Sequence, residues 1–309
     1  MAVVTSDFLA GVLTNFRATF QNAFDAARNI ATWREAVIEL QSQGLVETHN
    51  WLGTPPVMVD VSHGDLQIEG LFSFNYSITN LTWKAAIEVQ RAVFEDDRLG
   101  LIAPRLAQLG EEAARHPGQL VLQLPVDNGN AFDGAAFFAD TRVIGRSANI
   151  DNNLAQTGAT IANIQTDVAL VRRALRLFQD DQGRPMNNVL NFIMCEPGIE
   201  QAMYQALSVQ FPAAAPTVAG IIPADAAVRT LNGYTLMANP YITNANEWYG
   251  FAVTPTMKPF IYQTRIAPSL EGVTDPNTES GTIRDRFIYT ARARYNVGYG
   301  DPRYAVRVT

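Results

Sequence analysis

The stretch FEDDRLGLIAPRLAQLGEEAARHPG, residues 94–118, contains the clearest helix signal in the chain. Apolar side chains recur in it at the spacing of one helical face. They are Ile102, Leu106, Leu109 and Ala113. The pattern predicts a long amphipathic helix with one face toward a core.

Both ends of this predicted helix carry residues that usually mark helix boundaries. Asp96 and Asp97 favour the positive end of a helix, and Pro104 is tolerated only near the first turn. Pro117-Gly118 is expected to end the helix. His116, directly before that pair, is then interpreted as a cation at the helix C-terminus.

Upstream, the first residues of the chain also have helical periodicity. Apolar side chains form a stripe with a spacing of four, and Ser6 or Asp7 can cap the first turn. The stripe consists of Phe8, Val12, Phe16, Phe20 and Phe24. Two interpretations stay open: the stripe faces the core of its own chain, or it belongs to an arm that packs on a neighbouring subunit.

Between the two predicted helices the chain is β-rich and interrupted by turn residues. A strand is expected within 35–51, glycine and prolines at 53–56 break it, and alternating apolar residues follow over 66–78. Residues 50–86 together predict a long two-stranded excursion. Because such a hairpin is marginal in isolation, we expect it to lie on another surface.

Downstream, an α/β stretch precedes a mostly β C-terminal third. A second long helix is predicted over 161–178, then a buried strand at 189–194 and a helix at 199–207. The later predicted strands are Tyr234–Ala238, Trp248–Val253, Phe260–Ile266, Phe287–Tyr295 and Tyr304–Val308. Strands this far apart in the chain indicate the α+β class.

The composition excludes several classes of protein. Of 309 residues 47% are hydrophobic and 17% charged, and 23 basic against 30 acidic residues give a net charge of −7. A low charged fraction without a membrane span points to surface hidden in subunit contacts. The acidic balance argues against a protein that coats nucleic acid, and no secretory signal is present, so synthesis in the cytosol is expected.

The sequence offers little for catalysis, metals or cofactors. Histidines at 49, 63 and 116 lack the spacing of a zinc site, and Cys195, the single cysteine, fits a buried small hydrophobe. The loop 127–134 fails as a calcium loop and is expected to be an Asx/Gly turn. No catalytic residue, cofactor or metal ligand is therefore assigned.

Arg172, Arg173 and Arg176 form a small basic cluster on the second predicted long helix. No aromatic residues are interleaved with them, as a surface for single-stranded nucleic acid would require. A solvated or subunit-contacting face is therefore favoured over a nucleic-acid-binding one.

An ordered series of motifs between residues 51 and 104 resembles the major head subunit of Mu-like transposable bacteriophages. The series is Trp51-Leu52-Gly53, Pro56, Tyr76-Ser77-Ile78-x-Asn80, Trp83, Arg91, Phe94-Glu95-Asp96-Asp97-x-Leu99-Gly100 and Ala103-Pro104. It continues more loosely through Phe132-Asp133-Gly134, Phe137-Phe138, the strand–helix pair at 189–208, Asn232-Gly233, Trp248 and Pro259-Phe260-Ile261-Tyr262-Gln263-x-Arg265. The chain departs from the family at Val59-Asp60-Val61, where a Glu-Trp pair is usual, and at Asp140-Thr141-Arg142, where a histidine is usual.

The resemblance implies the α+β major capsid fold of tailed phages, the Hong Kong 97 type. That fold has an N-terminal arm, a long hairpin called the E-loop, a peripheral domain with a spine helix, and an axial domain. The implied divisions are 1–47 for the arm and first peripheral strand, 48–86 for the E-loop, 87–155 for the peripheral domain with the spine helix, 156–254 for the axial domain, and 255–309 for the returning peripheral strands and the C-terminus.

The implied function is that of a major capsid protein that self-assembles, as hexamers and pentamers, into an icosahedral shell around packaged double-stranded DNA. The shell belongs to the virion, and the subunit is made in the host bacterial cytoplasm. Aromatic residues of the arm and hairpin are then the candidates for contacts between subunits. They are Phe8, Phe16, Phe20, Trp51, Phe72, Phe74, Tyr76 and Trp83.

The implied partners are copies of the chain itself, a scaffolding protein, a portal and, as a further candidate, a decoration protein. Because the sequence begins directly with the expected arm, we expect the scaffolding protein to be a separate chain. DNA is expected to be enclosed without sequence-specific binding, and no membrane contact is expected. Lys84 is the only lysine near the hairpin, at its base, which argues against covalent cross-linking through hairpin lysines.

One alternative keeps the fold, namely an encapsulin-like bacterial nanocompartment that stores a protein cargo. It is less favoured because the matched motifs are of the phage type and no groove for a cargo peptide is identified. A soluble enzyme is the least favoured interpretation, since the chain contains no recognisable catalytic motif.

Overall fold

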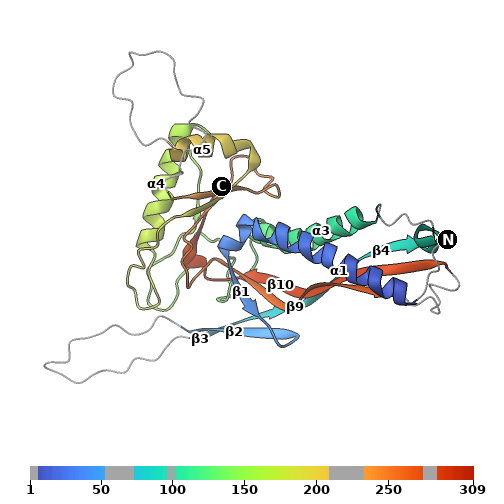
Figure 1. Ribbon diagram of the computed structural model, residues 1–309. Helices are drawn as coiled ribbons and strands as arrows, with labels where there is room; N and C mark the ends of the chain where they lie inside the picture. Colours follow the sequence, from blue (N-terminus) through green and yellow to red (C-terminus); the bar gives the residue numbers. More distant parts are fainter. Residues whose placement is uncertain (1–5, 53–72, 96–99, 101, 209–232, 274–283) are drawn as a thin grey trace, which may run out of the picture.

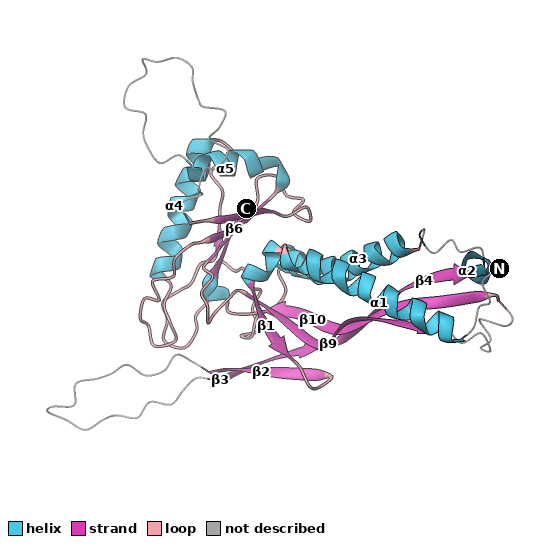
Figure 2. Cartoon of the chain, viewed as in Figure 1, coloured by secondary structure: helices cyan, strands magenta, loops and turns pink. Residues whose placement is uncertain are grey.

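The computed structural model describes residues 6–52, 73–95, 100, 102–208, 233–273 and 284–309 (Figure 1). These residues form a four-stranded sheet, a five-stranded sheet and a separate two-stranded hairpin. Helices α1 and α3 run along the first sheet, and helices α4 and α5 lie against the second (Figure 2). The molecule thus has an elongated part and a more compact part, and the predicted α+β class is confirmed.

The four-stranded sheet has the order β1-β9-β10-β4. Its strands are β1 Val37–Gln41, β4 Leu81–Gln90, β9 Phe260–Val273 and β10 Arg286–Tyr299. β1 pairs with β9 in parallel, whereas β10 pairs antiparallel with both β9 and β4. β9 and β10 extend beyond their predicted ranges, because pairing and alternating burial continue past Ile266 and Tyr295.

The first helix packs within its own chain. α1, Ser6–Asn29, joins α3 and the four-stranded sheet in one hydrophobic core. Phe16 meets Tyr289 of β10 edge to face, with ring centroids 5.2 Å apart. The phenylalanine stripe therefore faces the core of the same chain, as the first of the two interpretations predicts.

The helix quoted at the outset is longer than predicted. α3 covers Ala103–Asp127, and Pro117 and Gly118 lie inside it, so the prediction that this pair ends the helix is wrong. Proline inside a helix costs about 3 kcal/mol or more, because it removes a backbone hydrogen bond and crowds the preceding turn. Both residues are buried, and a Cβ on Gly118 would lie 2.5 Å from the Trp33 indole nitrogen. Packing against the rest of the chain thus outweighs the local preference.

The five-stranded sheet has the order β5-β11-β8-β6-β7. Its strands are β5 Asn153–Leu154, β6 Phe192–Cys195, β7 Thr235–Ala238, β8 Trp248–Phe251 and β11 Ala305–Val308. α4, Ile161–Leu177, and α5, Glu200–Ser208, contribute to its core, close to their predicted ranges. Cys195 is fully buried, as predicted, and burial raises the pKa of its thiol to about 12.

The hairpin consists of β2, Val46–Leu52, and β3, Ser73–Thr79, paired antiparallel from Val46↔Thr79 to Leu52↔Ser73. The predicted two-stranded excursion is confirmed for these residues. β4 was expected to belong to it as well, but it pairs with β10 in the four-stranded sheet. After β4 comes the short helix α2, Arg91–Glu95.

Short 3-10 turns lie between these elements, among them Thr32–Ala36, Pro197–Ile199 and Pro302–Tyr304. In the last two, the side chains of Glu196 and Asp301 accept from the backbone amides of Gly198 and Arg303. Asn128 ends α3 with a φ of 47°, and its side-chain oxygen accepts from the Phe138 amide at 2.6 Å. The loop after α3 is thus the Asx/Gly turn that the sequence predicts. Among the described residues, no helix has the length and apolar character needed to cross a bilayer.

Candidate assembly surfaces

The structure distributes the aromatic contact candidates over different environments. Phe16 and Phe20 are 5% and 1% exposed in the core beneath α1, and Phe8 is partly buried beside them. Trp51 and Phe74 are paired by their backbones in the hairpin. Phe72 lies outside the described residues. Phe16 and Phe20 can therefore influence a neighbouring subunit only by positioning α1, whose opposite face is exposed.

Tyr76 joins the hairpin to the four-stranded sheet. Its hydroxyl accepts from the Tyr299 amide of β10 at 3.3 Å, and burial raises its pKa. On the same strand, the Thr79 carbonyl accepts from the Asn296 side chain at 2.8 Å. Tyr76 is partly buried and packs against the core, so it combines an anchoring role with a small surface that a neighbour can touch.

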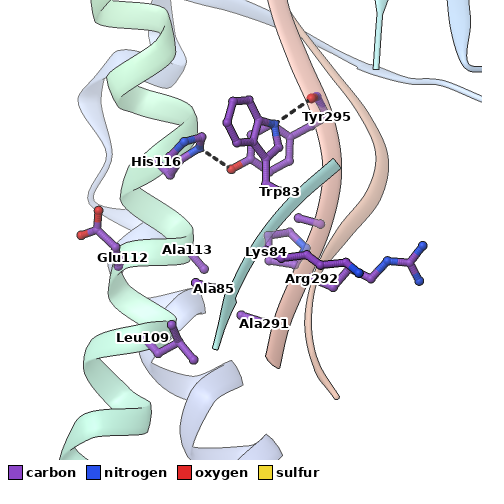
Figure 3. Close-up of a pocket in the computed structure, with 12 residues that line it drawn as sticks. Trp83, Lys84, Ala85, Leu109, Glu112, Ala113, His116, Ala291, Arg292 and Tyr295 are labelled. Atoms are coloured by element: carbon purple, nitrogen blue, oxygen red, sulfur yellow. Dashed lines mark hydrogen bonds between the residues drawn. The ribbon is translucent and has the colours of Figure 1, made fainter. Parts of the chain in front are cut away.

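Trp83 forms one wall of a pocket between α3 and the sheet (Figure 3). The pocket has a volume of about 120 Å³, and Leu109 and Ala113 form the helix side. The indole N–H of Trp83 donates to the Tyr295 carbonyl at 3.1 Å. The ring of His116 contacts the indole at a tilt of 56°, with ring centroids 4.4 Å apart. Trp83, α3 and β10 are thus bound into one unit.

His116 lies in the middle of α3, so its interpretation as a cation at a helix C-terminus is wrong. Its Nδ1 is 2.7 Å from the Tyr295 hydroxyl (Figure 3). Burial raises the pKa of Tyr295, so the hydroxyl stays protonated, and the imidazole tautomer decides which of the two groups donates. Burial lowers the pKa of His116, which Glu112 opposes only in part. Sequence reasoning missed this pocket because its walls come from segments far apart in the chain.

We expect the subunit to lose stability as the pH falls below 6.5, the ordinary pKa of His116. The unfolded chain binds a proton there, whereas the folded imidazole resists one, so stability is present above that pH and is lost below it. The effect should be below about 1 kcal/mol because the ring is only partly buried and water screens its charge. In denaturant titrations between pH 5 and 8, His116→Gln should have a smaller slope than the wild type. An unchanged slope would contradict the assignment.

The outer face of α4 carries the predicted basic cluster. Arg172, Arg173 and Arg176 are exposed, and no ion pair joins them to another described residue. Leu170 and Leu177 on the same helix are 42% and 57% exposed. Within the described part of the chain this face therefore combines unpaired positive charge with accessible apolar surface.

Comparison with known proteins assigns the chain to a family. The model of the Mu-like prophage major head subunit gpT matches residues 9–168 and 225–309. The chain belongs to this family of major head subunits. It is a capsid protein of the Mu-like type and has its place in the virion capsid, as the motifs implied.

Relatives agree with this assignment. The Mu-like prophage FluMu major head subunit of Haemophilus influenzae is 25% identical over 302 residues, which are 97% of this chain and 72% of that protein. The major capsid protein of Escherichia phage Mu is 29% identical over 138 residues, 44% of each. The family is one of structural capsid proteins, so the encapsulin-like alternative is not favoured.

Solved structures establish the fold. The procapsid protein of bacteriophage JBD30 has a TM-score of 0.59 at 22% identity and covers 99% of this chain and 76% of its own. A virus-like particle from Pyrococcus furiosus has a TM-score of 0.58 at 9% identity and covers 96% and 98%. The Hong Kong 97-type fold is thereby confirmed. At these identities the fold alone does not distinguish a phage head from another shell, and it is the family match that does.

Proposed function

We propose that the chain assembles as hexamers and pentamers into a closed icosahedral shell that encloses double-stranded DNA. The observation that carries this proposal is the hairpin β2–β3, which forms a sheet of its own outside both larger sheets. An isolated two-stranded ribbon is marginal in water, so it gains most when another surface covers it. In a closed shell every copy both offers such a ribbon and receives one, and many weak contacts add up.

We propose the domain divisions 1–47, 48–86, 87–155, 156–254 and 255–309 for arm, E-loop, peripheral domain, axial domain and returning strands. The placement of α3 in the third segment and of α4 and α5 in the fourth supports them. The pairing of two strands does not follow these divisions. β4 begins within the second segment but pairs with β10, and β11 lies in the last segment but pairs with β8 and β5.

We propose that the subunit has no catalytic activity and holds DNA without reading its sequence. The net charge of −7 supports the second part of this proposal, because an acidic wall does not bind the phosphate backbone of DNA strongly. Lys84 lies on β4 and not on the hairpin strands. We therefore expect the shell to be held together without covalent links through hairpin lysines. Salt-sensitive binding of free DNA by isolated subunits would contradict the proposal.

We propose a separate scaffolding protein, a portal and a decoration protein as partners, with the subunit made in the host bacterial cytoplasm. A procapsid is known for bacteriophage JBD30, and a capsid of that phage is decorated with minor capsid protein trimers. Both observations support the same class of partners here. The scaffolding protein is the partner expected to matter first, because it would act before the shell closes.

Electron microscopy of the full chain, produced alone and with a candidate scaffolding protein, tests the assembly proposal. We expect closed shells built of hexamers and pentamers, with regular size only in the second case. Small discrete oligomers in both cases would overturn it. Shells that carry a protein cargo in place of nuclease-protected DNA, when isolated from infected cells, would contradict the enclosed genome.

We further propose that the basic face of α4 contacts a neighbouring subunit. Replacing Arg172, Arg173 and Arg176 together by glutamate should reduce shell yield about fivefold or more, because like charges then meet across a contact. Surface changes of this kind alter the stability of a monomer by about 0.5 kcal/mol or less each. The matched triple lysine variant keeps the charge and should assemble normally. Equal shell yields for both variants would contradict the contact.

A further inference from the structure

The hairpin is attached to the four-stranded sheet in a way that strand pairing does not fix. The chain leaves the sheet from β1 at one edge and returns through β4 at the opposite edge. Only residues 42–45 and Asn80 connect the hairpin strands to these edges. β2 and β3 pair with each other and with no other described strand. Something other than a β-ladder must therefore set the direction in which the hairpin points.

Asn80 lies at the centre of this connection and is 2% exposed. Its side-chain amide donates to the Ser42 hydroxyl at 2.7 Å and to the Gly44 carbonyl at 2.9 Å. Its backbone amide donates to the Leu45 carbonyl at 2.8 Å. One residue at the exit of the hairpin thus holds the segment through which the chain enters it.

Gln263 reaches the same point from the middle of the sheet. It lies on β9 and is fully buried. Its amide nitrogen donates to the Asn80 side-chain oxygen at 2.9 Å and to the Ile78 carbonyl at 3.3 Å. Its amide oxygen is 2.9 Å from Nε2 of His49, which must be the donor because an amide oxygen only accepts. Gln263 therefore binds β2, β3 and the exit residue at once.

Glu47 closes the other side of the connection. Its carboxylate accepts from the Ser42 hydroxyl at 2.8 Å and from the amides of Gln43 and Gly44 at 3.3 and 3.4 Å. These bonds, that of Ser42 first, hold the pKa of Glu47 below its ordinary value. A continuous chain of hydrogen bonds thus runs from the turn after β1, through Asn80, to the centre of the sheet.

The apolar contacts at this connection come from Ile78 and Tyr76 of β3, which both pack against Gly298. Ile78 packs against Gly298, where a Cβ would lie 2.6 Å from the isoleucine Cδ1. Leu45, Val46 and Leu81, by contrast, are 54%, 50% and 44% exposed. Apolar contacts are non-directional, whereas buried hydrogen bonds fix both distance and angle and are costly to leave unmade. The polar side chains therefore supply the directional part of the attachment.

We propose that Ser42, Glu47, His49, Asn80 and Gln263 form a joint that fixes the direction of the hairpin relative to the four-stranded sheet, and so determines how one subunit engages the next. The inference rests on the proposed assembly function. Within it, Asn80 and Gln263 are positioning residues, since they act through the hairpin rather than by touching the neighbour.

The joint can be tested by measuring the direction of the hairpin itself. Spin labels at Asn75→Cys on β3 and Glu111→Cys on α3 occupy exposed positions, and buried Cys195 with its raised pKa should remain unlabelled. Labelled full-length subunits, diluted in unlabelled ones, should give a narrow distance distribution by pulsed electron paramagnetic resonance. Asn80→Ala should broaden or shift it, and the milder Ser42→Ala should do so to a smaller extent.

Asn239→Ala is the matched control, because Asn239 is also a fully buried asparagine and its amide donates to the Leu122 carbonyl, far from the hairpin. It should leave the distance distribution unchanged. Asn80→Ala should reduce the yield of regular shells about tenfold relative to this control, the effect expected when buried partners lose their hydrogen bonds. Unchanged distances in Asn80→Ala and Ser42→Ala would overturn the joint. A changed distance with normal shells would overturn its role in assembly, and failure of the wild type to form shells would instead count against the proposed function.

Discussion

Replacing Gly110 with alanine is expected to lower the free energy of unfolding of the subunit by about 1–3 kcal/mol. Gly110 lies inside α3 where α1 crosses it, and a Cβ there would be 2.5 Å from the Phe20 carbonyl oxygen and 3.3 Å from the Ala23 Cβ. A backbone carbonyl cannot rotate away as a side chain can. The two helices would have to separate, and the core between α1, α3 and the sheet would lose contacts throughout.

Gly11→Ala provides the matched control for this prediction. Gly11 is an exposed glycine inside α1, and no atom lies within 4 Å of the place that its Cβ would take. Alanine should stabilise that helix by about 0.5–1 kcal/mol, because glycine loses more backbone entropy on folding. Chemical denaturation of the unassembled subunits should show a lower unfolding free energy for Gly110→Ala and a higher one for Gly11→Ala than for the wild type. A stabilising Gly110→Ala would show that the close approach of the helices is not what holds α1 in place.

Periodicity in the sequence was sufficient for much of the fold. The four-residue spacing from Phe8 to Phe24 predicted α1, and the apolar spacing of 161–178 predicted α4 almost to its ends. Alternating segments located β7, β8 and β11 within a few residues. In these elements the local pattern and the packing agree, so the pattern is a faithful guide.

The sequence failed where packing contradicts a local rule. Pro117-Gly118 has the composition of a helix end, yet Gly118 is the site where Trp33 closes on α3. The error then spread to His116, which was placed at a helix terminus when its partner is Tyr295 on β10. No pattern within a short window of sequence indicates a contact between residues so far apart in the chain.

The environment of the candidate assembly residues was predictable only in part. Aromatic character selected Tyr76 and Trp83, which are partly exposed, together with Phe16 and Phe20, which pack in the core of the chain. Contacts of these residues with a neighbouring subunit stay a prediction. The polar joint was not predictable from composition, because Asn80 and Gln263 are separated by most of the chain. Family motifs contained both residues, although the resemblance alone gave no reason for their pairing.

Removing Arg303 is expected to cost about 3–5 kcal/mol of folding stability, the largest single effect anticipated here. Asp301 is fully buried, and the Arg303 guanidinium donates to it through Nε at 2.9 Å and through Nη2 at 2.6 Å. Arg303→Leu fills similar space but leaves a carboxylate in the interior without its counter-charge. The pair lies in the turn between β10 and β11, so the loss falls where the chain passes from one sheet to the other.

Arg286→Leu is the appropriate comparison, since Arg286 pairs with Glu88 at the surface and the two side chains are 46% and 48% exposed. It should change the unfolding free energy by about 0.5 kcal/mol or less, because water screens that pair. The double variant Asp301→Asn with Arg303→Leu should recover a large part of the lost stability, because it no longer buries an uncompensated charge. The asparagine side-chain oxygen can still accept from the backbone amide of residue 303, as Asp301 does. Denaturant titration of the wild type, the two single variants and the double variant measures these changes in unfolding free energy. If Arg303→Leu and Arg286→Leu lower the unfolding free energy equally, other groups compensate the buried carboxylate. The ion pair would then not be what stabilises the turn between β10 and β11.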